Sequence, residues 1–441
     1  MLKIFNTLSH RKEIFRPINS KEVRMYVCGP TVNDVPHLGH ARQQIVFDVF
    51  RRYLRFLGYK VKFVSNITDI DDKIINKARE NNEDIKRLTE RNLKIHLENY
   101  KKIGVEKPDF QPRASEYIRE MIDLIKTLEK KGYTYVIEND GVYYDVSKFS
   151  NYGKLSNLKK EKLIKGFRKS TSEKKRNKED FVLWKFSKEG EPWWDSPWGK
   201  GRPGWHIECS AMSKAILGLP FDIHGGGQDL IFPHHEDEIA QSEAAYEKRV
   251  ANYWVHNGMV NIEGIKMSKS LGNFKTIEEL LKEYSGELIR YFVISTHYRK
   301  PIEFSKKNLD NAKNSLNRLK KICLDLKNDS SKNEEYLKEF KESMDDDLNT
   351  PNALQVLWKL VRDKNAKGKF LTVKKIDEVF CLKLLKKEII RIPEEIKKLV
   401  MEREKARKEK NWELADSIRK KIFDRGFKID DSENGPKISR I

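Results

Sequence analysis

The first part of the chain alternates between strand-like and helix-like patterns of apolar residues. EVRMYVCG alternates and stops at Gly-Pro, which predicts a strand that ends at Cys28. In HARQQIVFDVFRRYLRFLGY the apolar residues recur at helical spacing, and Gly58 is a stop signal. KVKFVSNITDIDDKI indicates a second strand that runs into an acidic turn. The order strand, helix, strand predicts the beginning of a parallel α/β unit.

The remaining patterns predict an α/β part followed by a helical part. VYYDVSKF indicates a small β-rich insertion, PFDIHGGGQDL another strand with a glycine-rich exit, and HHEDEIAQSEAAYEK a helix. From about Ser305 onward the pattern is helical, and the chain ends in FKIDDSENGPKISRI, which we expect to be a short polar tail. Lys154–Lys178 is strongly basic and poor in apolar residues, so it predicts an exposed or mobile loop. The fold class is therefore α/β.

The composition indicates which partners and which cellular compartment to expect. The 441 residues carry 88 Lys and Arg against 67 Asp and Glu, a net charge of +21, which favours nucleic acid as a polyanionic partner over a membrane surface. A generally lysine-rich proteome is the alternative explanation. Four scattered cysteines suit a reducing cytosol rather than a disulfide scaffold. No signal peptide and no apolar run of about 18 residues is present, so we expect a cytoplasmic protein that does not span a membrane.

The junction between the first strand and the first helix is a candidate phosphate site. Ligands of open α/β sheets bind at the carboxyl ends of the strands, where a helix N-terminus presents free N–H groups. His37 and His40 are three residues apart and share one face of the first helical turn. Two imidazoles placed there could stabilise charge that develops on a phosphate. Capping or packing roles are the alternative.

A second candidate phosphate site is the segment GIKMSKSLGN. Lys266 and Lys269 lie in a loop bounded by Gly264 and Gly272. Two ammonium groups on such a loop can close over a polyphosphate, although solvated surface is the usual role of charged runs.

Cysteine, histidine and glutamate residues suggest a metal site. Cys28 ends the first strand, Cys209 lies in GWHIECSAMS, and a pair four residues apart on one helix face follows in HHEDEIAQSEA, namely His234 and Glu238. Two thiolates, an imidazole and a carboxylate make a plausible zinc shell. His235 competes with His234 for this role, and buried free cysteines remain the alternative.

Several motifs together resemble one enzyme family. PTVNDVPHLGH and KMSKS resemble the two signature motifs of class I aminoacyl-tRNA synthetases, the second letter for letter. YVCGPTVNDVPHLGHAR, GRPGWHIECSAMS and FDIHGGGQDLIFPHHEDEIAQSEA resemble the cysteinyl-tRNA synthetases in particular. The resemblance covers nearly the whole chain.

The resemblance implies the domain organisation. It suggests a Rossmann-like catalytic domain (1–110 and 201–248) with a connective insertion (111–200). A stem-contact region with the KMSKS loop (249–304), a helical bundle (305–392) and a C-terminal tRNA anticodon-binding region (393–441) would follow.

The resemblance also implies roles for individual residues. One Zn²⁺ per chain would be held by Cys28, Cys209, His234 and Glu238. Thr68 and Trp205 would wall the pocket for the substrate thiol, and Asp229 would hold the ammonium group. ATP with Mg²⁺ would be bound by His37, His40, Lys269 and the glycines that admit the adenosine, Gly225, Gly226 and Gly227. Lys266 and Lys269 would close over the departing pyrophosphate.

The implied reaction is ATP-dependent activation of L-cysteine and its transfer to the 3′-terminal ribose of tRNA(Cys). A monomer without a separate editing domain is expected. The C-terminal helices would contact tRNA phosphates through Lys405, Arg407, Lys408, Arg419, Lys420 and Lys421. Trp412 and Phe427 could stack on anticodon bases, or belong to the core of an amphipathic helix. The closing GPKISRI lacks the tryptophan that the family usually carries there, which weakens the expected picture of anticodon reading.

Two alternatives keep part of this chemistry. A ligase of the same ancestry could join activated cysteine to an amino sugar, but the basic helices near the C-terminus and the charge of +21 argue against it. A non-catalytic RNA-binding relative is the other alternative. Such relatives tend to lose a signature motif, and here all are intact.

Overall fold

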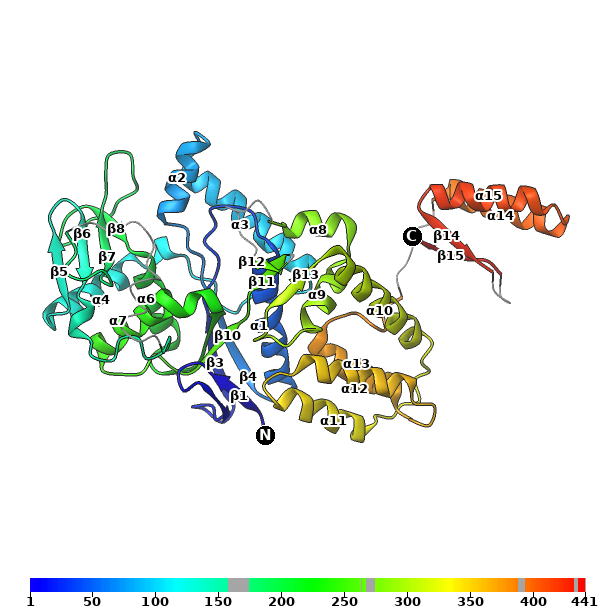
Figure 1. Cartoon of the computed structure of the whole chain (residues 1–441), viewed down its shortest axis with the longest axis horizontal. Helices are drawn as coiled ribbons and strands as arrows, with labels where there is room; N and C mark the ends of the chain where they lie inside the picture. The colour runs from blue at the N-terminus through cyan, green and yellow to red at the C-terminus, as the bar shows by residue number, and fades with distance from the viewer. Residues whose placement is uncertain (158–173, 263, 267–273, 388–392, 432–434, 441) are drawn as a thin grey trace. The chain divides into compact units, whose positions relative to one another are not determined.

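A computed structural model describes residues 1–157, 174–262, 264–266, 274–387, 393–431 and 435–440. The chain divides into two compact units, Met1–Leu385 and Lys386–Ile441. The larger unit is shown in Figure 1 as the blue-to-orange ribbon, and each unit is described separately below.

A parallel sheet forms the centre of the larger unit. Its four strands are β3 (Glu22–Val27), β4 (Lys60–Ser65), β9 (Phe221–Gly227) and β10 (Ala251–Asn257). They pair in the order β10-β9-β3-β4, and all three pairings are parallel. The strand order reverses at β3, because the next strand along the chain, β4, lies on one side of β3 and the later strand β9 lies on the other. The carboxyl ends therefore meet at one edge that has a topological switch point, and the α/β prediction is confirmed.

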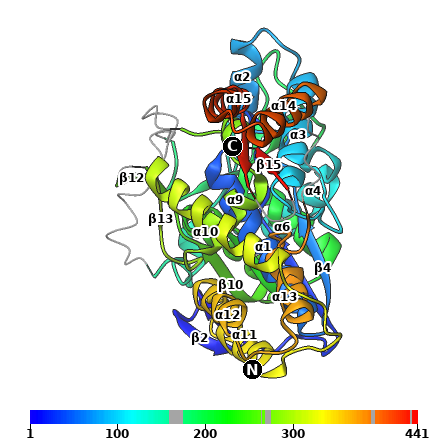
Figure 2. The ribbon, with the colours of Figure 1, turned by 90° about the vertical axis from the view of Figure 1, so that its right-hand side faces the viewer.

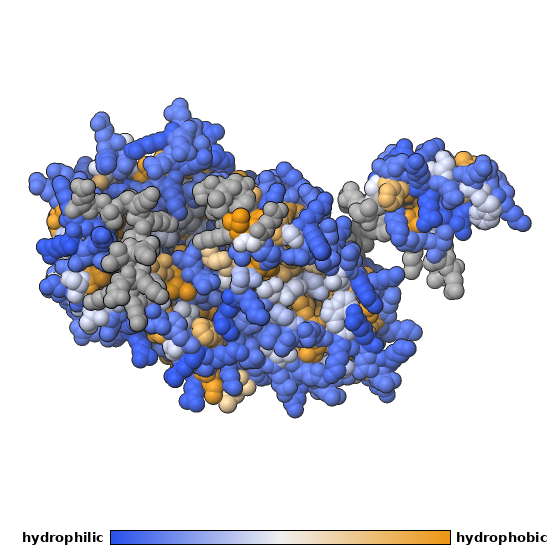
Figure 3. All heavy atoms as spheres, in the orientation of Figure 1, coloured by the Kyte–Doolittle hydropathy of each residue, from blue (hydrophilic) through white to orange (hydrophobic). Residues whose placement is uncertain are grey.

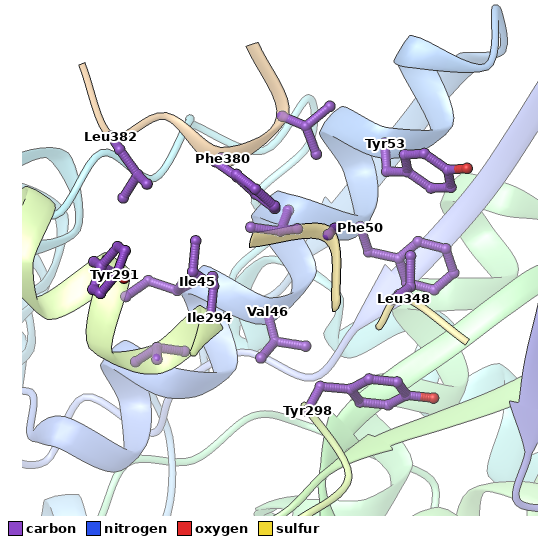
Figure 4. Packing of buried hydrophobic residues seen from close by; sticks show 14 of the residues in the cluster. Ile45, Val46, Phe50, Tyr53, Tyr291, Ile294, Tyr298, Leu348, Phe380 and Leu382 are labelled. Carbon is purple, nitrogen blue, oxygen red and sulfur yellow. The ribbon is translucent and has the colours of Figure 1, made fainter. Parts of the chain in front are cut away.

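The helix α1 (Leu38–Phe56) connects β3 to β4 and carries the largest core. A capping box starts it: the His37 side chain accepts from a backbone N–H in the first turn, and the His40 side chain accepts from the N–H of His37. Beyond its C-terminus Gly58 adopts a φ of +95°, which only glycine takes without strain. Figure 4 shows Ile45 and Val46 of α1 packed near Ile294 of α9 (Gly286–Ile294), in a cluster that buries apolar area as the main source of stability.

An antiparallel sheet is inserted between β4 and β9. It has the order β5-β6-β7-β8, with β5 (Thr134–Ile137), β6 (Gly141–Tyr144), β7 (Phe181–Phe186) and β8 (Gly201–Pro203). It shares a second core with α4 (Ile118–Lys130), α6 (Trp205–Leu217) and α7 (Glu236–Tyr246). Before it come α2 (Asp72–Glu80) and α3 (Ile85–Lys102). The predicted β-rich insertion thus includes β6.

Smaller strands and a set of helices complete the larger unit. The strands are the hairpin β1 (Lys3–Asn6) and β2 (Arg11–Ile14), and the sheet β12-β11-β13 with β11 (Val260–Ile262), β12 (Ile265–Lys266) and β13 (Ile302–Phe304). The helices are α8 (Ile277–Glu283), α10 (Lys306–Leu324), α11 (Glu334–Asp345), α12 (Thr350–Arg362) and α13 (Lys369–Phe380). Figure 2 shows the N-terminus beside α11, where the Met1 amino group pairs with Asp345 at 3.2 Å.

The smaller unit pairs two helices with a hairpin. It contains α14 (Glu394–Lys408), α15 (Trp412–Asp424), β14 (Phe427–Asp430) and β15 (Lys437–Arg440). The expectation of a polar tail was wrong, because β14 and β15 pair antiparallel. Phe427 and Ile429 alternate with polar residues and are buried against α14 and α15. Phe427 is therefore a core residue and cannot stack on a base, whereas the Trp412 side chain is 58% exposed.

The surface agrees with the charged composition. Figure 3 shows hydrophilic residues over most of the coloured surface on the face displayed. Within the described ranges, no helix has the length and apolarity that a membrane crossing requires. The predicted basic loop begins with residues that contact the rest of the protein, because Lys154 forms an ion pair with Glu243 and Leu155 is buried. Residues 158–173 of this segment lie outside the described residues.

Candidate active site

Four buried side chains converge at the carboxyl edge of the parallel sheet. Cys28 follows β3, Cys209 lies on α6, and Glu238 lies in the first turn of α7. His234 belongs to the short helical turn Ile231–His235 that leads into α7. One ligand atom from each of the four lies within 4.8 Å of the others. The tertiary structure thus gathers residues from three separate parts of the chain.

The spacing of these atoms fits a tetrahedral metal ion. The Sγ atoms of Cys28 and Cys209 are 3.6 Å apart, and Cys28 Sγ is 3.4 Å from Glu238 Oε1. His234 Nε2 lies 3.2 Å from the same carboxylate oxygen. A tetrahedral zinc ion, with bonds of about 2.3 Å to sulfur and about 2.0 Å to nitrogen or oxygen, holds its ligand atoms roughly 3.3–3.8 Å apart. The donor set and its spacing therefore both suit zinc.

The electrostatics of the cluster also suit a cation. Burial raises the pKa of the Cys28 and Cys209 thiols, so without a cation both stay protonated. Burial would also raise the pKa of Glu238, but the charge and hydrogen bond of His224 outweigh it and hold that pKa below its usual value. A bound divalent cation would favour both thiolates, because it reverses the cost of placing negative charge in this interior.

A second set of four possible metal ligands shares two residues with the first set. Cys28 and Glu238 also lie within 4.8 Å of ligand atoms of His224 and His235. His224 Nε2 is 2.8 Å from the outer oxygen of Glu238, and His235 Nε2 is 3.3 Å from Cys28 Sγ. His224 thus contacts Glu238 and His235 contacts Cys28, which is the arrangement of groups that orient metal ligands. The competition between His234 and His235 that the sequence suggests persists in the geometry.

Other residues that surround the cluster escaped the sequence analysis. His234 Nδ1 lies 2.9 Å from Nδ1 of His206, whose Nε2 is 3.3 Å from Asp237. On the opposite side, His235 Nδ1 is 2.7 Å from His256 Nε2, and burial lowers the pKa of His256 to about 3. These residues come from three separate parts of the sequence, so no single local pattern identifies them.

Of the residues predicted to line the amino-acid pocket, Trp205 contacts the cluster. The Trp205 indole stacks on the His234 ring, with centroids 4.3 Å apart. Thr68 is buried, and its hydroxyl donates to Glu208 Oε2 at 2.7 Å. Asp229 is exposed just beyond the carboxyl end of β9. A cavity of about 490 Å³ adjoins Trp205 and reaches into the inserted sheet. Their roles toward a substrate stay predictions.

The HLGH segment fixes the tautomers of its two histidines. His37 Nδ1 accepts from the Gly39 N–H at 3.0 Å, and His40 Nδ1 accepts from the His37 N–H at 3.2 Å. A ring that accepts at Nδ1 carries its proton on Nε2. Each imidazole therefore has an Nε2–H donor, and the two rings are in contact, with centroids 3.9 Å apart and planes tilted by 35°. Such a pair can donate to phosphate oxygens at a helix N-terminus.

The second signature motif joins the first through its flanking residues. Lys266 ends β12, whereas Lys269 lies outside the described residues. Residues just after the KMSKS motif bond to the start of α1. The Leu38 N–H donates to the Lys275 carbonyl at 3.0 Å, and the Ile277 N–H donates to the Pro36 carbonyl at 3.0 Å. The residues that follow the KMSKS loop are thus bonded to the start of the HLGH helix. Arg42 of α1 also donates to the Met259 carbonyl ahead of β11 at 2.5 Å.

The three glycines of β9 have packing reasons of their own. A Cβ on Gly225 would lie 2.3 Å from the Phe47 ring, and one on Gly226 would lie 2.9 Å from the His235 ring. A Cβ on Gly227 would lie 2.5 Å from Asp229 Oδ1. A side chain at Gly225 or Gly226 would collide with a packed ring, whereas at Gly227 the exposed Asp229 side chain would have to move. The binding of adenosine there stays a prediction.

Comparisons with known proteins give one consistent family. The family described as tRNA synthetases class I (C) catalytic domain matches residues 14–314, and the DALR domain matches residues 339–386. A curated cysteine–tRNA ligase of Thermococcus gammatolerans is 47% identical over 100% of this chain and 99% of its own length. One from Francisella tularensis subsp. tularensis is 49% identical over 98% of this chain and 97% of its own length.

Solved structures agree on the fold. Methionyl-tRNA synthetase of Mycobacterium tuberculosis, in complex with methionyl-adenylate, covers 83% of this chain and 90% of its own with a TM-score of 0.58 and 15% identity. A leucyl-tRNA synthetase complex of Agrobacterium radiobacter K84 has a TM-score of 0.58 at 11% identity, over 84% of this chain and 85% of its own.

Proposed function

Because this chain belongs to the cysteine–tRNA ligase family, we propose that it activates L-cysteine with ATP and transfers the cysteinyl group to the 3′-terminal ribose of tRNA(Cys). One observation carries the proposal. The thiol-rich cluster around Cys28 and the HLGH helix terminus lie at the same carboxyl edge of one parallel sheet. An amino-acid site and a nucleotide site at that edge are what adenylation requires.

Cys28, Cys209, His234 and Glu238 are the proposed zinc ligands, and Thr68, Trp205 and Asp229 are proposed to line the amino-acid pocket. Zinc, when bound, supplies thiolate recognition, because a coordinated thiol is deprotonated outright. A serine hydroxyl binds far less readily and alanine offers no ligand, and a site built for one polar group rejects analogues that lack it. Trp205 supports this placement because it stacks on His234 at the wall of the cluster.

In the activation step, a carboxylate oxygen of cysteine bonds to the α-phosphorus of ATP while the α-phosphorus–oxygen bond to pyrophosphate breaks. No protein nucleophile takes part, so orientation and charge stabilisation account for the rate. The Nε2–H groups of His37 and His40 would donate to phosphate oxygens at the helix N-terminus. Lys266 and Lys269 would neutralise the leaving pyrophosphate, Gly225, Gly226 and Gly227 would admit the adenosine, and Mg²⁺ would accompany the nucleotide.

In the transfer step, a ribose hydroxyl of the tRNA attacks the carbonyl carbon of cysteinyl-adenylate and AMP leaves. The smaller unit is proposed to contact the anticodon arm. Trp412 supports this role because it is exposed and lies 6.0 Å from the Arg407 guanidinium, and an exposed aromatic beside a cation suits unpaired bases. We propose that the chain acts as a cytoplasmic monomer.

The test is charging of bulk tRNA with radiolabelled cysteine and ATP, with and without a zinc chelator. Charging that is lost on chelation and restored by zinc is the expected result. Cysteine-dependent exchange between ATP and pyrophosphate without any charging would overturn the assignment of tRNA as acceptor. Exchange and charging that survive complete removal of the metal would overturn zinc recognition but not the ligase activity.

A further inference from the structure

One face of α3 supports the segment that leads into the HLGH motif. Four buried residues recur at every fourth position along this helix: Leu88, Asn92, His96 and Tyr100. Asn92 Nδ2 donates to the Val32 carbonyl at 3.0 Å, and His96 Nε2 lies 2.9 Å from the Asp34 carbonyl. Both carbonyls belong to the irregular stretch between β3 and α1, which ends at His37.

The chemistry of His96 suits this contact. A carbonyl oxygen only accepts, so His96 must carry a proton on Nε2. Its Nδ1 lies 3.0 Å from the Tyr100 hydroxyl, so both nitrogens of the fully buried ring have a hydrogen-bond partner. The same ring meets His40 edge-on, with centroids 5.4 Å apart and planes at 68°. His96 therefore contacts both the backbone before the motif and one of its imidazoles.

We propose that Asn92 and His96 are positioning residues for nucleotide activation. They hold the 32–34 segment so that His37 caps α1 and the two motif imidazoles keep their orientation. The inference rests on the proposed function, in which those imidazoles meet ATP phosphates. A catalytic group displaced by about 1 Å can lose on the order of 100-fold in rate, so a support of this kind matters even without touching the substrate.

The attachment of α3 does not depend on these two polar residues. Val32, Ile67, Ile74 and Leu88 form a separate apolar cluster with neighbouring residues of α2 and α3. Removing a hydrogen bond from Asn92 or His96 should therefore leave the helix docked, and the substitutions can be examined in a folded enzyme.

The experiment compares four variants of the full chain: Asn92→Ala, His96→Ala, His96→Gln and the control Asn99→Ala. Asn99 is buried on the same helix, and among the described residues its side chain forms no hydrogen bond with the 32–34 segment. Cysteine-dependent exchange between ATP and pyrophosphate gives kcat and both KM values, and metal content is measured alongside. Hydrogen exchange of the peptides that cover residues 30–42 is read by mass spectrometry.

We expect kcat to fall on the order of 10- to 100-fold in His96→Ala, with the cysteine KM and zinc content within twofold of wild type. His96→Gln should recover most of the rate, because its amide can donate where Nε2 did. Exchange of the 30–42 peptides should accelerate in Asn92→Ala and His96→Ala but not in Asn99→Ala.

Unchanged kcat and unchanged peptide exchange in His96→Ala would overturn the inference. Equal losses in His96→Ala, His96→Gln and Asn99→Ala would also overturn it, since general destabilisation would explain them. A wild-type enzyme with no cysteine-dependent exchange would instead refute the proposed function, and hydrogen exchange would still decide whether α3 orders the segment.

Discussion

His37 packs against Phe274, with ring centroids 5.1 Å apart and ring planes at 76°. His37 belongs to the HLGH motif, and Phe274 is the first described residue after the KMSKS motif. The two backbones also bridge directly at His37 and Thr276. The HLGH motif is therefore in contact, through a ring and a backbone pairing, with the residues that follow the KMSKS motif more than 200 positions later in the sequence.

Phe274→Ala should slow activation without weakening cysteine binding. An edge-on aromatic contact contributes about 0.5–1.5 kcal/mol, which corresponds to roughly a 2- to 10-fold loss of kcat. Phe274→Tyr keeps the ring and serves as the matched control. Exchange kinetics at saturating ATP measure the effect, and equal kcat for the alanine and tyrosine variants would show that the contact does not matter for the rate.

Cys209→Ser should release the metal and raise the cysteine KM while leaving ATP binding nearly intact. Loss of a group that merely supports a metal ligand costs 10- to 100-fold, so we expect the cysteine KM to rise more than about tenfold. Elemental analysis gives the zinc content, and exchange kinetics give both KM values. Cys323→Ser, which alters a buried cysteine outside the cluster, is the control. Normal activation with unchanged zinc content would refute the assignment of the metal site.

Lys269→Ala should lower the activation rate much more than it raises the cysteine KM. Removing one group that stabilises transition-state charge costs about 100- to 1,000-fold in kcat. Single-turnover formation of cysteinyl-adenylate, measured by rapid quench, separates this step from tRNA transfer. An effect on KM alone would mean that the loop binds substrate and does not stabilise the transition state.

Trp412→Ala should weaken tRNA charging and leave cysteine activation unchanged. Stacking of a base on an aromatic side chain is worth about 1–3 kcal/mol, so the tRNA KM should rise roughly 5- to 100-fold. Phe427→Ala is a contrasting variant, because Phe427 is buried and its loss should destabilise the smaller unit. A tRNA KM that Trp412→Ala does not change would remove this residue from the tRNA interface.

Asp48 gives a prediction for acid stability. Burial alone would raise the pKa of Asp48, but the charges of Arg290 and Arg52 lower it below its usual value. A carboxyl whose folded-state pKa is depressed stabilises the fold above its unfolded pKa of about 3.9 and loses that contribution as the pH falls further. Asp48→Asn should therefore cost about 3–5 kcal/mol near pH 7, because Arg290 stays buried without its charge partner.

Urea unfolding at pH values between 7 and 3 tests this expectation. The difference between wild type and Asp48→Asn should shrink below about pH 4, where Asp48 of the unfolded wild-type chain protonates before Asp48 of the folded protein. A difference that is constant across this range would show that packing, and not charge, accounts for the loss.

The sequence by itself determined the elements and the motifs. Alternation in EVRMYV predicted β3, helical spacing and Gly58 predicted the extent of α1, and these signals are local, so they survive without knowledge of the partners. The α/β class followed from their order. The sequence pattern did not predict the hairpin near the C-terminus. Phe427 and Ile429 belong to β14, and the alternation of apolar and polar residues in its partner β15 is too short to predict a strand by itself.

The tertiary structure alone decided which residues meet. Cys28 and Cys209 come within 3.6 Å because the carboxyl end of β3 lies beside the N-terminal half of α6, and no periodicity in the sequence encodes a contact over 181 residues. The contacts of four further histidines are also between residues far apart in the sequence, and the sequence patterns did not predict them. His206, His224 and His256 lie next to the cluster, and His96 contacts His40. Residues that act through packing show their role only when the distant elements that carry them are brought together.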